Sequence, residues 1–212
     1  MLVGSDAVGV FSKAIAEHLV VVQQVEDQQN VLRAIALAMT AALQAGGKIL
    51  WCGNGGSAAD SQHLAAELVG RFRRERRGLA SLALTTDTSI LTSLANDYGY
   101  EAVFSRQVQA LGTPGDLLVG ISTSGNSCNV VAALEAARSR GLKTVALTGQ
   151  GGGNMAALAD YLFAVASRDT ARIQEAHILV GHMLCDWVEL ECLNGQPAAE
   201  QTVAVIRSEV TR

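Results

Sequence analysis

Residues 48–72 read KILWCGNGGSAADSQHLAAELVGRF, and this stretch decides the fold. The apolar run 49–52 is too short for a helix, and a glycine-rich turn at 53–57 follows it. Apolar residues then return at helical spacing, at Leu64, Leu68 and Phe72. The stretch therefore predicts a strand, a loop and a helix, in that order.

The glycine-rich loop suits a phosphate, because glycines let the backbone approach an anion and the next helix points its free N–H groups at the same place. The segment from Gly53 to Ala58 also fits the dinucleotide pattern G-x-G-x-x-A. A dinucleotide site needs an acidic residue after the second strand, where Asp87 fits a helix N-cap at least as well. The predicted anion-binding residues are Asn54, Gly55, Gly56 and Ser57.

Two polar residues follow on the predicted helix, His63 and Glu67, four positions apart. This spacing places both side chains on one helix face, about 6 Å apart along the axis. Most such pairs are solvated, but an imidazole and a carboxylate can also bind a metal or move protons. The pair is a candidate for chemistry.

The composition is that of one α/β domain with appended helices, since the 212 residues are 49% hydrophobic. The net charge of −4 gives no general attraction to nucleic acid or an anionic membrane. No apolar run reaches the roughly 18 residues of a membrane span, and the four cysteines show no C-x-x-C spacing. We expect a cytoplasmic protein with reduced thiols that binds no nucleic acid directly and no membrane.

Helical spacing predicts two N-terminal helices whose apolar faces pack on the core and on another subunit. The strand and helix patterns that follow alternate, and right-handed crossovers then give a doubly wound, flavodoxin-like parallel sheet of five strands. We divide the chain into 1–46 (N-terminal helices), 47–195 (core domain) and 196–212 (tail). The predicted helices are 5–27, 29–45, 87–97, 101–111, 129–140 and a long 170–194, stopped by Gly195; the later strands are 80–84, 116–121, 143–147 and 161–165.

A second polar loop follows the third strand, STSGNS at 122–127. It lies on the same edge of the sheet as the first loop, because parallel strands present their C-terminal ends together. Two converging loops suit a phosphate monoester better than a pyrophosphate, which disfavours NAD. The candidate phosphate-binding hydroxyls are Ser122, Thr123, Ser124 and Ser127.

The arginine-rich run 71–77 predicts a solvated loop. An interface or an anion contact is the alternative, and Arg71 at the helix end is its candidate residue. On the last helix, His177 is predicted to be a core or interface histidine.

Five segments in chain order resemble the sugar isomerase (SIS) domain family, and within it the phosphoheptose isomerases: GNGGSAADSQHLAAELVGRF, ANDYG, GISTSGNS, ALTGQGGG and ARIQEAHILVGHMLCDW. The resemblance implies a homotetramer with one zinc ion per subunit. It also implies the conversion of sedoheptulose 7-phosphate to glycero-manno-heptose 7-phosphate, toward the heptose of bacterial lipopolysaccharide.

The resemblance assigns roles to individual residues. The substrate loop falls on residues 54–57, and the phosphate hydroxyls fall on the second loop. Asn96 and Asp97 match the sugar-contacting pair, while Ala171 replaces an Asp of some members and puts the exact sugar in doubt. Glu67 and His182 match the base and the acid. The implied metal ligands are His63, Glu67, Gln174 and His182.

The chemistry can also be argued directly, because ketose–aldose interconversion through an enediol needs a base over the carbons and an acid near the oxygens. Zinc tolerates such a set of nitrogen and oxygen ligands. A zinc-bound carboxylate is a weak base, so Glu67 must use its second oxygen or leave the metal. Gln174 and His182 lie about 12 Å apart along the helix and about 80° around it. We therefore expect a site at a subunit interface.

Two alternatives remain. One is a regulator that resembles the DnaA initiator-associating protein, a tetrameric binding module of the same family. That branch lacks a Glu at position 67 and a His at position 182, and carries an Arg where this chain has Ser124. The other is an isomerase of a different sugar phosphate. The retained acid and base favour an isomerase.

Overall fold

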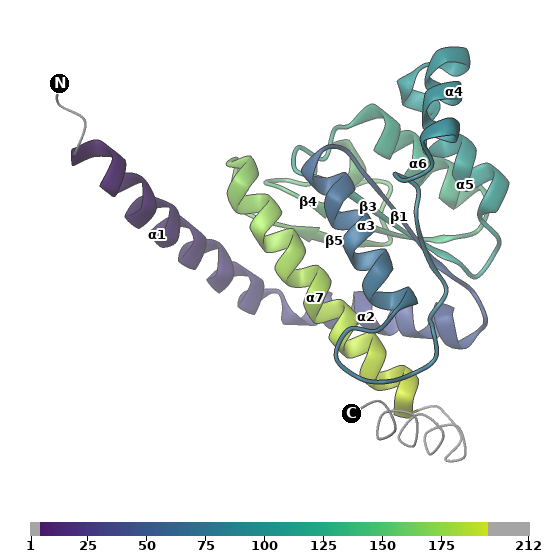
Figure 1. Ribbon diagram of the computed structural model, residues 1–212, viewed down its shortest axis with the longest axis horizontal. Coiled ribbons are helices and arrows are strands. Elements are labelled where there is room, and N and C mark those ends of the chain that lie inside the picture. Colours follow the sequence, from purple (N-terminus) through teal and green to yellow (C-terminus); the bar gives the residue numbers. More distant parts are fainter. Residues whose placement is uncertain (1–4, 195–212) are drawn as a thin grey trace.

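The computed structural model describes residues 5–194, and it shows a parallel sheet covered by helices on both faces (Figure 1). The predicted stop at Gly195 and the tail 196–212 lie outside the described residues. The strands are β1 (Ile49–Gly53), β2 (Ser81–Ala83), β3 (Leu117–Ser122), β4 (Lys143–Thr148) and β5 (Tyr161–Ala164).

The five strands lie in the order β2-β1-β3-β4-β5, and every pairing is parallel. At the centre, Ile49 of β1 pairs with Leu117 of β3, and the register continues to Gly53 and Ile121. This is the flavodoxin-like order, in which the chain winds outward from β1 in both directions. The predicted doubly wound fold is confirmed.

Strand alternation divides the interior into two cores, because successive side chains point to opposite faces. Ile49 and Trp51 of β1 belong to the core under α2 (Gln29–Gln44), α3 (Gly56–Val69) and α7 (Thr170–Asn194). Leu50 and Cys52 belong to the core under α5 (Ser105–Leu111) and α6 (Cys128–Ser139). All four side chains are fully buried, so β1 contributes to both cores.

The first helix, α1 (Ser5–Asp27), extends away from the sheet (Figure 1). Its contacts with the rest of the chain include ion pairs to α7, where His18 and Glu17 meet Glu175 and Arg172. Most of its apolar residues stay exposed. The division at residues 46 and 47 stays a prediction. Among the described residues, no helix has the length and apolar character needed to cross a membrane.

Several predicted boundaries are wrong. The predicted helix 101–111 is broken into a 3₁₀ turn, η1 (Tyr100–Ala102), and α5, and between them Val103 and Phe104 turn inward and are fully buried. The helix α4 (Thr88–Tyr98) precedes this turn and begins where predicted, with Asp87 as its N-cap. A second 3₁₀ turn, η2 (Gly153–Met155), precedes β5.

Candidate functional site

The two predicted loops meet at the point where the strand order reverses. The loop after β1 leads into α3 and the loop after β3 leads into α6, on opposite faces of the sheet. In open α/β sheets, ligands bind in the crevice outside the strands at such a point. The topology therefore places the predicted anion site where this class of fold binds its ligands.

The first loop depends on glycine at two positions. A Cβ on Gly53 would lie 2.8 Å from Ser57 Cβ and 2.9 Å from the Ile121 carbonyl oxygen. Gly55, the N-cap of α3, has φ +56, which side chains rarely tolerate. Among the described residues, no side chain caps this end of α3. The positive end of the α3 dipole therefore lies at this loop, where it favours an anion.

Three hydroxyls of the second loop converge. Ser122 Oγ lies 2.8 Å from Ser127 Oγ and 3.4 Å from Ser124 Oγ. The turn is held by Asn126, whose backbone N–H donates to Ser124 Oγ at 3.1 Å. Thr123 is half-buried, and its carbonyl accepts from the Gly149 N–H. The hydroxyls are thus preorganised as a cluster on one side of the crevice.

An amide pair that the sequence did not suggest joins the two loops. Asn54 Nδ2 donates to Asn129 Oδ1 at 2.8 Å, and Asn129 Nδ2 donates back to Asn54 Oδ1 at 2.9 Å. Asn129 is buried on α6, whereas Tyr100 is exposed and donates to Asn54 Oδ1 at 3.3 Å. The pair therefore holds Asn54, a predicted substrate residue, between both loops.

Two turns further along α3, the structure brings three predicted ligands together within one chain. His63 Nε2 lies 3.3 Å from Glu67 Oε1 and 2.8 Å from His182 Nε2 of α7. One ligand atom from each residue lies within 4.8 Å of the other two, and the cluster is partly exposed. It is therefore a possible His/Glu/His metal site.

The donor chemistry of this cluster fits a divalent ion. Two imidazole nitrogens and a carboxylate are a common catalytic zinc set that leaves a fourth position for substrate or water. Nitrogens bound at zinc distances in tetrahedral geometry lie about 3.3 Å apart, so the two rings need to separate by only about half an ångström. The residues present therefore fit such an ion.

The His182 ring is held between two other rings. His63 meets it edge-on, with centroids 5.0 Å apart, and Phe72 stacks on it at 5.4 Å with an interplanar angle of 17°. Burial, the neighbouring His63 and the positive charge of Arg73 lower the pKa of His182, although Glu67 opposes them. At neutral pH the ring is therefore uncharged, the form that binds metals.

The remaining predicted residues lie apart from this cluster. Gln174 contacts the other end of α3, where a Cβ on Gly56 would lie 2.4 Å from Gln174 Nε2. Asn96 and Asp97 are exposed near the end of α4, and Asn96 Nδ2 donates to Asp97 Oδ1 at 2.7 Å. Arg71 is exposed and pairs loosely with Glu75. Their roles in binding stay predictions.

His177 is a core histidine, which is one of the two positions predicted for it; the other was a subunit interface. Its ring is fully buried, and Nε2 lies 3.1 Å from the Thr148 carbonyl oxygen. Burial lowers the pKa of His177 to about 4, although the hydrogen bond opposes the shift. The ring is therefore neutral and structural.

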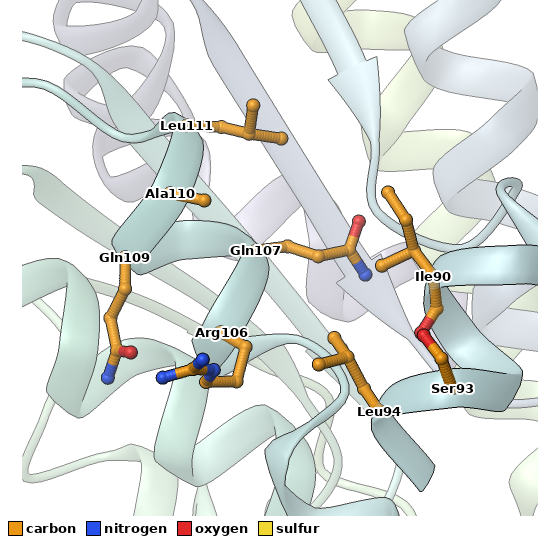
Figure 2. Close-up of a pocket in the computed structure, with 8 residues that line it drawn as sticks. All are labelled: Ile90, Ser93, Leu94, Arg106, Gln107, Gln109, Ala110 and Leu111. Carbon is orange, nitrogen blue, oxygen red and sulfur yellow. The ribbon is translucent and has the colours of Figure 1, made fainter. Parts of the chain in front are cut away.

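A groove of about 500 Å³ lies between α4 and α5, as Figure 2 shows. It contains none of the predicted site residues, and its one charged group, the Arg106 guanidinium, lies 4.8 Å from the centre of the Tyr98 ring. The lining residues are Ile90, Ser93, Leu94, Arg106, Gln107, Gln109, Ala110 and Leu111.

Comparison with known proteins agrees with this fold. A family model described as the SIS domain matches residues 13–149, and the chain therefore belongs to the SIS domain family. Relatives within this family point to the phosphoheptose isomerases. A phosphoheptose isomerase of Nitratidesulfovibrio vulgaris is 64% identical over 160 residues, which cover 74% of this chain and 77% of that protein. One from Akkermansia muciniphila is 60% identical over 164 residues, covering 77% and 87%.

A solved structure gives the same result. Phosphoheptose isomerase GmhA from Neisseria gonorrhoeae matches with a TM-score of 0.81 and 49% identity, over 85% of this chain and 97% of that chain. Within the SIS family, this chain thus belongs to the phosphoheptose isomerases.

Proposed function

We propose that the chain is a sugar-phosphate isomerase that converts sedoheptulose 7-phosphate to glycero-manno-heptose 7-phosphate through an enediol. The observation that carries the proposal is the His63/Glu67/His182 cluster. His63 and Glu67 lie on α3, which begins at the glycine-rich loop, and His182 of α7 joins them. Relatives named phosphoheptose isomerase at 60–64% identity support it over the regulatory alternative.

The separation of the two parts of the site suits a long substrate. Gly56, at the start of α3, lies seven residues before His63 and eleven before Glu67, about 10 and about 16 Å along the helix axis. The Glu67 carboxylate nevertheless lies 3.3 Å from His63 Nε2. A phosphate bound by the helix N-terminus and the hydroxyls of Ser122, Ser124 and Ser127 leaves an extended seven-carbon chain enough length to bring its first two carbons to Glu67. A three-carbon phosphate would not reach.

Glu67 and His182 supply the proton transfers. Glu67 Oε1 faces His63, so Oε2 is the oxygen that removes a proton from C1 of the ketose and returns it to C2 of the enediol. The uncharged His182 ring gives its N–H proton to the oxygen on C2 and takes one back from the oxygen on C1, which becomes the aldehyde. One proton moves between carbons and one between oxygens, so the reaction is balanced.

The same cluster would hold a zinc ion, with His63, Glu67 and His182 as ligands and Gln174 as a further candidate from the start of α7. A bound ion would polarise the carbonyl and make the adjacent C–H more acidic. Gln174 packs at the opposite end of α3 from His182, which supports a site that a neighbouring subunit completes in a homotetramer. We place the enzyme in the cytoplasm, in lipopolysaccharide heptose synthesis; its four cysteines are free.

The test is proton exchange. The zinc-loaded protein is incubated with sedoheptulose 7-phosphate in heavy water, and NMR follows deuterium at C1 and C2 and the appearance of the aldose. We expect exchange in the wild type, its loss in Glu67→Gln, and its retention in Glu135→Gln, an exposed carboxylate on α6. A protein that binds sugar phosphates but exchanges no proton with this or other ketose phosphates would be the regulatory module instead.

A further inference from the structure

The arginine-rich loop after α3 is anchored by one buried carboxylate. Glu189 of α7 is completely buried and accepts three backbone hydrogen bonds, from Phe72 at 2.9 Å and from Arg73 and Arg74 at 2.8 Å each. Its Oε1 also lies 3.2 Å from Nε of Arg76, whose side chain is equally buried. The prediction of a solvated loop therefore holds for the exposed Arg71, Arg73, Glu75 and Arg77 but is wrong for Arg76, which is buried.

Arg76 connects the same carboxylate to the end of α3. Its Nη2 donates to the Glu67 carbonyl at 2.9 Å, and its Nη1 donates to the carbonyls of Leu68 and Gly70 at 2.9 and 3.0 Å. Glu67 and Leu68 lie in the last turn of α3 and Gly70 is its C-cap, so their carbonyls have no further helical turn to accept from. The Leu68 carbonyl also accepts from the Leu79 N–H. The pair Glu189–Arg76 therefore ties the backbone of Glu67 to α7, the helix that carries His182.

The same loop also contacts the His182 ring, through Phe72. The N–H of Phe72 is held by Glu189, and the Phe72 ring stacks on the His182 ring. The Arg73 guanidinium lies over the Phe72 ring, 5.1 Å from its centre. One buried carboxylate thus fixes the backbone of Glu67 and the ring that packs on His182.

We propose that Glu189 is a positioning residue for the His63/Glu67/His182 cluster, and that it acts through Arg76 and Phe72. The inference rests on the isomerase proposed above and adds residues outside the reacting groups. A buried ion pair is weak evidence for stability alone, whereas groups that orient ligands change metal affinity or activity by about 10- to 100-fold.

The experiment compares Glu189→Gln, Phe72→Leu and Phe72→Tyr with the wild type. The control is Glu191→Gln, which removes the same charge from a half-exposed position two residues further along α7. Two quantities are measured: the dissociation constant for Co²⁺ from its visible absorption without sugar, and kcat and KM for sedoheptulose 7-phosphate. Phe72→Leu keeps the buried Glu189–Arg76 pair and removes only the ring that stacks on His182. If Glu189→Gln fails to fold, this variant still tests the contact through which Glu189 is proposed to act.

We expect Glu189→Gln and Phe72→Leu to weaken Co²⁺ binding and to lower kcat about 10-fold or more. KM should stay within about twofold, because the phosphate loops lie at the other end of α3. Phe72→Tyr, which keeps the ring, and Glu191→Gln should behave as wild type. Variants that lose only thermal stability, with Co²⁺ binding and kcat unchanged, would overturn the proposal.

The two readouts separate this inference from the proposed function. If the wild type binds Co²⁺ but isomerises no sugar, the proposed isomerase function is wrong. The Co²⁺ dissociation constants of the variants then decide whether Glu189 positions the cluster. If the wild type isomerises the sugar without binding Co²⁺, the proposed metal site is wrong. The kcat values of the variants then decide the role of Glu189. A protein that does neither would overturn both proposals.

Discussion

At the scale of the residue, Gly56 shows how a missing side chain shapes the site. The Gln174 amide occupies the space where a Cβ would stand, at the first residue of α3. Gly56→Ala leaves a backbone that an alanine can adopt, because its φ is not positive, and it gains helix propensity of up to about 1 kcal/mol. We expect the variant to unfold at the same or a higher temperature while kcat/KM falls about 10-fold or more, since Gln174 is displaced.

A double-mutant cycle checks that the effect passes through Gln174. Gln174→Ala should itself lower kcat/KM, and adding Gly56→Ala to it should cost little more. Additive losses in the cycle would show that Gly56→Ala does not act through Gln174, and an unchanged kcat/KM in Gln174→Ala would contradict a binding role for this amide. Steady-state kinetics and thermal unfolding of the three variants are sufficient.

The same scale shows what the sequence could not reveal. The loops and the pair His63 and Glu67 were predictable, because glycines, hydroxyls and helical spacing are local patterns. The burial of Arg76 was not, because it lies in a run of charges whose partner, Glu189, is 113 positions away. The one available signal was that Glu189 lies seven residues after His182, on the same face of one helix.

At the scale of the element, α3 and α7 run side by side in the same direction, with Gly56 near Gln174 and Leu64 against Gly181. A Cβ on Gly181 would lie 2.5 Å from both terminal carbons of the Leu64 side chain, which is fully buried. The glycine thus permits the close packing that brings His63 to His182.

Gly181→Ala should therefore destabilise the protein although alanine favours helices. Overpacking costs about 1–3 kcal/mol, and the gain in propensity offsets about 1 kcal/mol of it. We expect a lower midpoint of urea unfolding and weaker activity. Gly9→Ala on α1, where a Cβ meets nothing within 4 Å, is the matched control and should not lower the midpoint. Equal midpoints for the two variants would show that α3 has room to move.

Secondary structure was predictable where apolar spacing is regular and uninterrupted. The five strands and the helix from Thr170 follow such patterns, and their order was correct. The break before Ser105 was not predictable, because Val103 and Phe104 also fit a continuous helical pattern. The helix breaks there because both side chains are buried in the core under α5 and α6. Helix ends were also misplaced where capping comes from a distant side chain, as with Arg76 and the end of α3.

At the scale of the whole molecule, α1 carries an apolar face that the described part of the chain does not cover. Phe11, Ile15 and Leu19 recur every four residues on its projecting part, and Phe11 is 72% exposed. Single exposed apolar residues are ordinary, but a contiguous row along one helix marks an interaction surface. A second copy of the chain is the partner that the proposed homotetramer supplies, and its approach would also complete a site that spans subunits.

The variant Phe11→Glu/Ile15→Glu places two charges on this face and should prevent assembly. Light scattering after size exclusion should then give the 22.1 kDa mass of one chain, whereas the wild type gives a multiple of it. Lys13→Glu changes the net charge equally at an exposed polar position of the same helix and should leave the assembly intact. If the dissociated variant loses isomerase activity while Lys13→Glu keeps it, the neighbouring subunit contributes to the site. Dissociated chains that retain full activity would instead place every catalytic group within one chain, and Gln174 would then need no partner subunit to act.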